Sequence, residues 1–253
     1  MPDTRGETVR RQFGPSAEAY LASASHARGE DLDQLIGFAA VAATDVALDV
    51  GCGVGHTLRR LAPLARLVVG ADLTVGMLQG AQRLVATEGI ANAILVVSPA
   101  EALPFLDGSF NVVTCRLAAH HFFDVAAAFR EARRALGVGG RFVLADNYAP
   151  DDHALDRFIN TLERLRDPSH VREHTVGAWR ELLRAAGLEP RDEARTMLRI
   201  DRERWLAQAR TIERDADAVR AMLRSADTDA VRAFRIDEDG FSVLKVIISA
   251  EAR

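Results

Sequence analysis

The sequence has few cysteines and no long apolar run. Cys52 and Cys115 are too few for a disulfide framework in a chain of 253 residues, which favours a reducing cytoplasm. No window of about 18 or more apolar residues occurs, so no transmembrane helix is expected. Residues 1–7 also lack the apolar stretch of a secretory signal. We therefore expect a cytoplasmic protein with no membrane partner.

Positive charge is also in short supply. The chain has 32 Lys and Arg against 36 Asp and Glu, and a net charge of −4 disfavours nucleic acid or anionic lipid as a partner. Lys245 is the only lysine, and we attribute this arginine bias to genome composition rather than to chemistry. The apolar fraction of 48% and the charged fraction of 27% are typical of globular chains, and the length fits one α/β domain with an elaborated end.

Short apolar runs alternate with helical patterns in the middle of the chain. The run at 46–50 ends in a glycine cluster, which is typical of a buried strand in a parallel sheet. Similar runs occupy 67–71, 94–97, 110–115 and 141–145, separated by helical segments of which 74–87 and 125–136 are the clearest. Glycines within 137–140 would stop the second helix and turn the chain into the next strand. The alternation predicts a doubly wound α/β fold, a parallel sheet with right-handed crossovers.

The two ends of the chain have other patterns. Residues 1–44 are helix-rich and would form a cap before an α/β core at 45–150. A lid insert and helix would follow at 151–188, and residues 189–253 would complete the same domain. In these parts we expect helices at 152–166 and 176–186, strands at 193–200 and 241–249, and an amphipathic helix at 202–224. That helix would face the sheet or a second subunit, so the sequence also allows a homodimer.

A glycine-rich loop follows the first predicted strand. Glycines at 51, 53 and 55 stand where the strand would turn sharply into a helix, whose N-terminus offers unpaired N–H donors to a ligand. A dinucleotide fingerprint, G-x-G-x-x-G, would place glycine where this chain has His56, which weakens the hypothesis of a nicotinamide-dinucleotide oxidoreductase. Asp72 closes the next strand, nineteen residues after Gly53, where a carboxylate accepts the ribose hydroxyls of a nucleoside.

Several ordered motifs resemble those of a known family. They are DVGCGVG at 49–55, GADLT at 70–74 followed by Met77 and Leu78, AEALPF at 100–105, DGSF at 107–110, HHFFD at 120–124 and LGVGGRF at 136–142. This order resembles class I S-adenosylmethionine (SAM)-dependent methyltransferases, in particular the ubiquinone/menaquinone-biosynthesis subgroup. The resemblance implies a seven-stranded, mainly parallel sheet whose last strand is antiparallel, an N-terminal helical cap, a helical lid and SAM as the methyl donor.

The resemblance also assigns roles to particular residues. The backbone at Gly51, Gly53 and Gly55 would pass under the methionine part of SAM, with Asp49 near its amino group. Asp72 would take the ribose hydroxyls and Leu73 would flank the adenine. The adenine-edge loop would hold Ala100 and Glu101, although Pro99 stands where many relatives have an acidic residue. Tyr20, in a segment similar to the family's cap, could reach the SAM carboxylate or pack under its helix.

Two adjacent histidines are the candidates for proton transfer. His120 and His121 follow the fourth predicted strand, at the carboxyl edge where open α/β sheets bind ligands. Successive residues of a regular backbone point apart, so we expect one of them, His121 by preference, to meet the substrate; otherwise both pack or cap the next helix. Arg116, Asn147 and Tyr148 end strands at the same edge, and would touch SAM or the substrate, or stay rim residues.

The segment H-V-R-E-H at 170–174 supports two interpretations. It fits the H-x-x-E-H pattern of some zinc peptidases, with His170 and His174 as ligands and Glu173 as base, so a zinc hydrolase is an alternative. We favour a substrate lid that brings Arg166 and His170 to the acceptor, or else a solvated connection. Methyl transfer is a direct displacement that needs no metal. We expect a small organic acceptor and no nucleic acid, and whether carbon, oxygen or nitrogen is methylated stays open.

Overall fold

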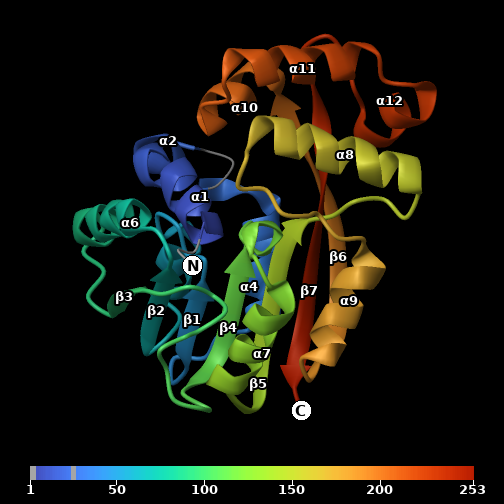
Figure 1. Ribbon diagram of the computed structural model, residues 1–253. Coiled ribbons are helices and arrows are strands. Elements are labelled where there is room, and N and C mark those ends of the chain that lie inside the picture. The colour runs from blue at the N-terminus through green and yellow to red at the C-terminus, as the bar shows by residue number, and fades with distance from the viewer. Residues whose placement is uncertain (1–3, 24–26) are drawn as a thin grey trace.

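A single sheet of seven strands runs through the centre of the protein (Figure 1). The computed structural model describes residues 4–23 and 27–253, so residues 1–3 and 24–26 of the predicted cap lie outside the described part. The strand order is β3-β2-β1-β4-β5-β7-β6. The strands are β1 (Val46–Val50), β2 (Leu67–Asp72), β3 (Ala93–Val97), β4 (Phe110–Arg116), β5 (Leu136–Asn147), β6 (Leu188–Asp201) and β7 (Gly240–Ala252).

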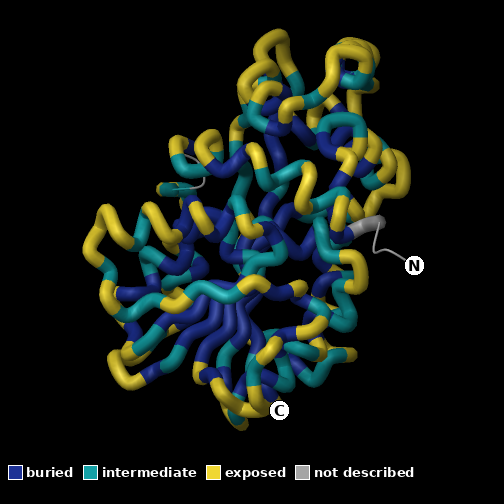
Figure 2. Tube along the Cα trace, turned by 60° about the vertical axis from the view of Figure 1, so that its left-hand side comes forward, coloured by how far each residue is buried: buried dark blue, intermediate teal, exposed yellow. Residues whose placement is uncertain are grey.

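The first five strands are parallel, and β7 runs antiparallel to both β5 and β6. The apolar runs of β1 and β4 are buried on both faces, as expected for central strands of a parallel sheet. Figure 2 shows this buried centre between more exposed helices. The predicted seven-stranded α/β fold with an antiparallel last strand is confirmed.

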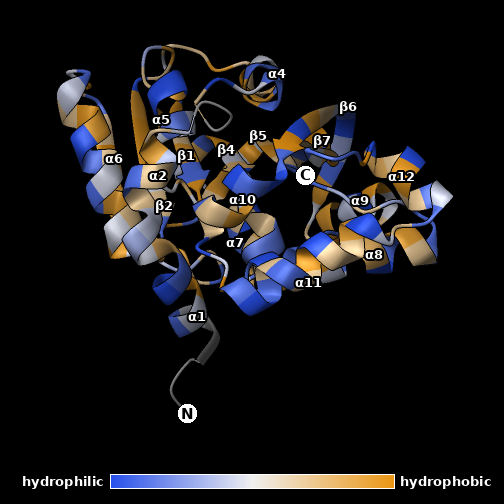
Figure 3. Ribbon diagram, turned by 90° about the horizontal axis from the view of Figure 1, so that it is seen from above, coloured by the Kyte–Doolittle hydropathy of each residue, from blue (hydrophilic) through white to orange (hydrophobic). Residues whose placement is uncertain are grey.

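Helices cover both faces of the sheet (Figure 3). One apolar cluster joins a face of the sheet to α4 (Glu30–Ala39) and α5 (His56–Leu61), with α6 (Val75–Thr87) packed beside them. The other face packs against α7 (Val125–Ala135) and α9 (Val176–Ala185), where Phe129 and Trp179 are fully buried. The result is a three-layer structure with its ligand-binding edge at the carboxyl ends of the parallel strands.

Two groups of helices stand over that edge (Figure 1). The first is the N-terminal cap, α1 (Thr4–Phe13), the short turn η1 (Gly14–Ser16) and α2 (Ala17–Leu21), which packs on α6. The second comprises α8 (His153–Arg166), α10 (Arg202–Ala209), α11 (Glu213–Arg224) and α12 (Thr228–Phe234), and it surrounds its own apolar cluster with the upper ends of β6 and β7. The cavity described below lies between these groups and the sheet.

Three element assignments differ from the sequence-based expectation. The single helix predicted at 202–224 is wrong: Arg210 adopts a left-handed backbone (φ 57°), which ends α10 before α11 begins. The glycine-rich residues 137–140 belong to β5, which begins at Leu136 directly after α7. The helix α12 was not predicted. None of the helices in the described ranges is long and apolar enough to cross a bilayer.

Candidate active site

The glycine-rich loop after β1 exposes its backbone to a cavity. Gly51, Gly53 and Gly55 have φ values of +69°, +54° and +88°, in the left-handed region that favours glycine. The N–H groups of Gly51 and Cys52 donate to the carbonyl of Ala71 (2.8 and 3.1 Å), which ties the loop to β2. A Cβ placed on Gly53 would meet nothing within 4 Å, so this part of the loop leaves open space for a ligand.

Asp72, at the end of β2, is held in one orientation by the backbone. Its Oδ2 accepts from the Gly53 N–H and its Oδ1 accepts from the Thr74 N–H, both at 2.8 Å. Burial raises the pKa of Asp72, and the two N–H donors oppose that rise. Each carboxylate oxygen keeps acceptor capacity for a further donor, because an ionised carboxylate has about four lone-pair sites.

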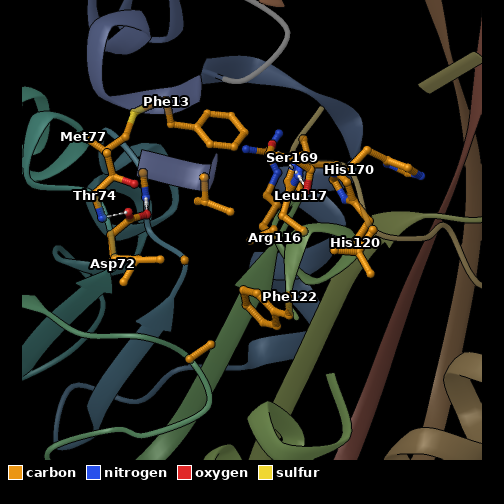
Figure 4. Close-up of a pocket in the computed structure, with 18 of the residues that line it drawn as sticks. Phe13, Asp72, Thr74, Met77, Arg116, Leu117, His120, Phe122, Ser169 and His170 are labelled. Carbon is orange, nitrogen blue, oxygen red and sulfur yellow. Dashed lines mark hydrogen bonds between the residues drawn. The ribbon is translucent and has the colours of Figure 1, made fainter. Parts of the chain in front are cut away.

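One cavity of about 900 Å³ connects this loop to the lid. Figure 4 shows Asp72, Thr74 and Met77 on one side of it and His120 and His170 on the other. A volume near the top of the range for ligand pockets, roughly 300–1,000 Å³, leaves room for more than one small molecule. We call the side of Asp72 the nucleoside end and the side of the histidines the acceptor end.

The acceptor end contains a buried ion pair. His120 Nδ1 lies 2.5 Å from Asp146 Oδ1, while Asp146 Oδ2 accepts from the Ala119 N–H (2.8 Å). Burial alone would lower the pKa of His120, but the Asp146 carboxylate outweighs it and raises that pKa to about 9. Burial opposes ionisation of Asp146 too, yet the His120 charge holds the pKa of this carboxyl below its ordinary value. His120 is therefore an imidazolium near neutral pH.

His121 is neutral and has a defined tautomer. Burial and the charge of His120, whose ring centroid is 4.1 Å away, lower the pKa of His121 to about 4. Its Nδ1 lies 3.2 Å from the carbonyl oxygen of Ser169, which can only accept, so Nδ1 carries the hydrogen. The other ring nitrogen, Nε2, therefore keeps its lone pair, and His121 lines the cavity with Phe13 edge-on against it at 4.9 Å.

His170 comes from the lid segment between α8 and α9. Asn160 Oδ1 accepts from the Glu173 N–H (2.8 Å), so the contact with His170 Nε2 (3.1 Å) makes that nitrogen a donor. Burial, followed by the charge on His120, lowers the pKa of His170 to about 2, so its ring is neutral. The N–H groups of Val171 and Arg172 both donate to the His120 carbonyl, which fastens the lid to η2 (Ala119–His121).

Arg166 ends α8 and also lines the cavity. Its guanidinium lies over the Trp205 ring, 4.7 Å from the centroid, and its Nη1 pairs with Glu163 Oε2 at 3.4 Å. The Arg166 side chain also hydrogen-bonds to Tyr20, whose pKa is raised by burial despite the nearby positive charge. The contact joins the N-terminal cap to the lid across the cavity.

A second cluster of charges lies where β4 ends, beside the interior of β7. Arg116 Nε donates to Asp31 Oδ2 (2.6 Å), and Lys245 Nζ donates to Asp31 Oδ1 (3.1 Å). Both cations line the cavity, and all three side chains are at most 4% exposed. Despite the burial penalty, these two cations hold the pKa of Asp31 below its ordinary value.

Most residues proposed from the sequence line this cavity. They are Tyr20, Gly51, Gly53, Asp72, Leu73, Ala100, Glu101, Arg116, His120, His121, Asn147, Arg166 and His170. Both adjacent histidines line the cavity, because they lie in a 3₁₀ turn rather than in regular extended backbone; which of them meets the substrate stays a prediction. Glu101 Oε1 accepts from the Phe123 and Asp124 N–H groups, so this carboxylate also braces the start of α7.

Three proposed residues are not among those that line the cavity. Asp49 is buried beneath the loop, where its Oδ1 accepts from Thr114 Oγ1 at 2.8 Å, and burial raises its pKa to about 7. Gly55 packs towards α6, with Ala81 3.3 Å from where its Cβ would stand. Tyr148 follows the last β5 residue and its ring lies under the Arg195 guanidinium, 5.7 Å from the centroid, so the structure does not support a substrate contact for it.

Some residues of the cavity were missed in the sequence. Lys245 was attributed to genome composition, but the structure shows that it is only 2% exposed. The pattern that could have revealed its position is a lysine within the apolar run of the strand predicted at 241–249. Asp31 and Asp146 do not line the cavity themselves but pair with Arg116, Lys245 and His120, which do, and they gave no separate signal because these partners lie far away in the chain. Trp205 was attributed to helix packing alone.

The zinc interpretation of H-x-x-E-H does not fit the structure. Residues 170–175 form no helix, and the His174 ring packs against Trp179, 4.7 Å away. In the part of the chain that the structure describes, no group of three or more His, Cys, Asp or Glu residues could hold a metal ion. Burial also raises the pKa of both cysteine thiols well above its ordinary value, which makes them poor nucleophiles.

Comparison with known proteins identifies the family. Residues 48–144 match the methyltransferase-domain family. The uncharacterized methyltransferase YcgJ of Bacillus subtilis is 41% identical over 204 residues, which cover 81% of each chain. The chain belongs to the class I SAM-dependent methyltransferases. The oxidoreductase and zinc-hydrolase alternatives are therefore set aside.

Solved structures agree with this methyltransferase assignment. The crystal structure of YcgJ superposes with a TM-score of 0.85 at 35% identity, covering 88% of this chain and 98% of that one. A putative methyltransferase from Bacillus halodurans C-125 gives 0.84 at 32% identity, covering 88% and 99%. A demethylmenaquinone methyltransferase of Roseiflexus castenholzii is 35% identical over 145 residues, or 55% of this chain and 60% of that protein. The predicted resemblance to the quinone-pathway subgroup is confirmed at the level of family.

Proposed function

We propose that this methyltransferase binds SAM at the nucleoside end of the cavity and passes its methyl group to a small organic acceptor at the other end. The observation that carries the proposal is the single cavity that joins Asp72 to the histidines. Asp72, with both oxygens fixed by backbone donors, fits the two ribose hydroxyls, and the open side of Gly53 fits the methionine part. SAM supplies the methyl group when bound.

The protein's own contribution is alignment and exclusion of water. A displacement at a methyl carbon gains most from holding donor and acceptor in line in a closed site. The cap residue Phe13 and the lid residue His170 close the cavity from two sides. His121 Nε2 would accept a hydrogen bond from the acceptor and orient it, since a ring nitrogen with a pKa of about 4 is a weak base.

The same proposal gives each segment a task. Residues 1–44 cap the cofactor, residues 45–150 bind it, the insert at 151–188 covers the acceptor, and residues 189–253 complete the sheet and the acceptor wall. The lid assignment is supported by the two backbone hydrogen bonds from Val171 and Arg172 to His120. The chemical class of the acceptor, a small molecule, is supported by the volume of the cavity and by the name of the demethylmenaquinone methyltransferase relative.

Calorimetric titration tests the cofactor assignment. We expect SAM and its demethylated product, S-adenosylhomocysteine (SAH), to bind, and NAD(P) and zinc not to bind. Asp72→Ala removes a charge-assisted acceptor and should weaken SAH binding by about 1.5–3 kcal/mol, or about 10- to 150-fold. Asp151→Ala, an exposed carboxylate outside the cavity, is the matched control. Unchanged SAH affinity in a folded Asp72→Ala protein would sink the assignment.

A further inference from the structure

His56 lies at the glycine loop and has no part in the function proposed above. It directly follows Gly55, the N-cap of α5, and holds the last position of the G-x-G-x-x-G pattern, where a dinucleotide fold needs glycine for close packing of helix and strand. Here that position carries an imidazole, which lines the cavity together with Gly53. The residue is 7% exposed, so its ring nitrogens need partners inside the protein or in a ligand.

The His56 ring is neutral and has a defined tautomer. Its Nε2 lies 3.0 Å from the carbonyl oxygen of Tyr20, which can only accept, so Nε2 carries the hydrogen. Burial lowers the pKa of His56, and the charges of Arg59 and Arg116 lower it further, although the Tyr20 carbonyl opposes them. Nδ1 therefore keeps its lone pair near neutral pH.

This lone pair is not used within the protein. Nδ1 of His56 is buried, and it has no hydrogen-bond partner among the residues that the structure describes. A buried acceptor without a partner is costly, and nearly all such groups in folded proteins are paired. Because the ring lines the cavity, a ligand is the remaining source of a partner, and that partner has to be a donor.

The methionine part of SAM contains one group of this kind. Its ammonium has three donors and no acceptor, whereas its carboxylate can only accept. Asp49, which the family resemblance places near this ammonium, lies buried beneath the loop and is not among the residues that line the cavity. His56 offers an acceptor on the cavity side of the same loop, next to the open position at Gly53.

We propose that His56 is a cofactor-binding residue, whose Nδ1 accepts a hydrogen bond from the amino group of SAM. The same ring donates through Nε2 to the Tyr20 carbonyl, so it joins the bound cofactor to the N-terminal cap. This inference rests on the proposed function, because it concerns SAM at the nucleoside end of the cavity.

Three ligands, titrated by calorimetry, separate the groups of the methionine part. They are SAH, its thiobutyrate analogue, which lacks the amino group, and its thiopropylamine analogue, which lacks the carboxylate. In His56→Gln the side-chain amide stands as many bonds from the backbone as Nε2, and no acceptor replaces Nδ1. We expect this variant to weaken SAH and the thiopropylamine analogue by about 10- to 150-fold, and the thiobutyrate analogue less than twofold.

A second variant and a control guard against a general loss of folding. In His56→Asn an acceptor oxygen stands as many bonds from the backbone as Nδ1, while the donor to Tyr20 is lost. We expect His56→Asn to keep most of the preference for SAH over the thiobutyrate analogue. His153→Gln makes the first change at an exposed histidine on α8, and all three affinities should equal those of the unaltered protein.

Nuclear magnetic resonance follows the same nitrogen in the unaltered protein. With ¹⁵N in the histidines, the Nδ1 resonance of His56 is the one that the His56→Asn spectrum lacks. We expect SAH to move this resonance towards the position of a protonated nitrogen, because the lone pair then shares a hydrogen. The thiobutyrate analogue should leave it nearly unchanged.

The remaining outcomes separate this inference from the proposed function. If SAH does not bind the unaltered protein, the proposed function has failed, and this inference fails with it. If SAH binds, but His56→Gln weakens the thiobutyrate analogue as much as SAH, or SAH leaves the His56 resonance in place, only the role of His56 is wrong. Loss of affinity for SAH and the thiobutyrate analogue, with the thiopropylamine analogue unaffected, would assign His56 to the carboxylate and also overturn the proposal.

Discussion

Three neighbouring histidines of the acceptor end differ in protonation because one of them has a carboxylate. Asp146 keeps His120 charged, while burial, together with the charge on His120, keeps His121 and His170 neutral. The site therefore offers a fixed cation next to neutral ring nitrogens. Histidine is usually the group that changes charge near neutral pH. Because the pKa values of these three histidines are shifted away from neutrality, the site keeps one pattern of hydrogen-bond donors and acceptors around pH 7.

Replacing His121 or His170 tests their placement at the acceptor. The acceptor can be found by incubating cell extracts with methyl-labelled SAM. We expect His121→Ala and His170→Ala to lower kcat/KM by about 5- to 150-fold, the cost of one or two lost hydrogen bonds of roughly 1–3 kcal/mol in total. SAH affinity, measured by calorimetry, should change little.

The control is His153→Ala, which replaces an exposed histidine on α8 and should turn over normally. Normal turnover in both variants would make the two residues structural, and loss of SAH binding in both would move them to the cofactor end.

Glu173 makes stability depend on pH. Burial and the neighbouring Glu163 raise the pKa of Glu173 to about 8, so the folded protein holds a proton that the unfolded chain releases above its ordinary pKa of 4.5. The unfolded state thus binds fewer protons between about pH 4.5 and 8, and stability falls as pH rises through this window. Glu173→Gln mimics the protonated carboxyl and lacks this loss.

We expect the stabilities of Glu173→Gln and the unaltered protein to be similar near pH 4.5 and to separate as pH rises. Above pH 8 the variant should be more stable by on the order of 2–4 kcal/mol. Urea unfolding at pH 5, 7 and 8.5 measures the difference, and Glu181→Gln, an exposed position on α9, should follow the unaltered protein. A constant difference across the three pH values would show that Glu173 is already ionised in the fold.

At the scale of elements, the parallel strands β1 to β5 could be predicted from the sequence, because central parallel strands are continuous apolar runs. The glycine loop and Asp72 could also be placed, since chain order alone brings adjacent strand ends to one edge. The edge strand β6 was only partly predicted: more than half of its residues are polar, and a bulge interrupts its pairing with β7 between Pro190 and Glu193.

Elements whose ends depend on distant contacts were harder to predict. The helical period continues through the break between α10 and α11, so only the left-handed backbone at Arg210 reveals it. The lid segment at 170–175 has the spacing of a zinc helix, yet the N–H groups of Val171 and Arg172 bond to the His120 carbonyl instead of forming a helical turn. The ion pairs of Asp31 and Asp146 join residues 26 to 214 positions apart, a separation that carries no local pattern.

On the scale of the whole molecule, the cavity is enclosed by parts that are distant in sequence. The cap supplies Phe13 and Tyr20, the sheet edge supplies Asp72 and the histidines, and β7 supplies Val243. Polar contacts join α1 and α2 to the rest of the protein at single points, among them His56 Nε2 with the Tyr20 carbonyl at 3.0 Å and Gln12 Nε2 with the Ala209 carbonyl at 2.7 Å. A ligand between cap and sheet should therefore hold the two together.

We expect SAH to stabilise the whole protein and to protect the cap in particular. At 100 times its Kd, SAH should add about 2.7 kcal/mol, which raises Tm by about 5–10 °C at roughly 2–4 °C per kcal/mol for a chain of this size. Amide exchange should slow most in residues 6–22, because local opening of the cap would need SAH to leave first.

The Asp72→Ala variant is the control, and in it both effects should be lost at the same SAH concentration. Protection that is confined to α11 and α12, with the cap unchanged, would place SAH at the other end of the cavity and contradict the assignment.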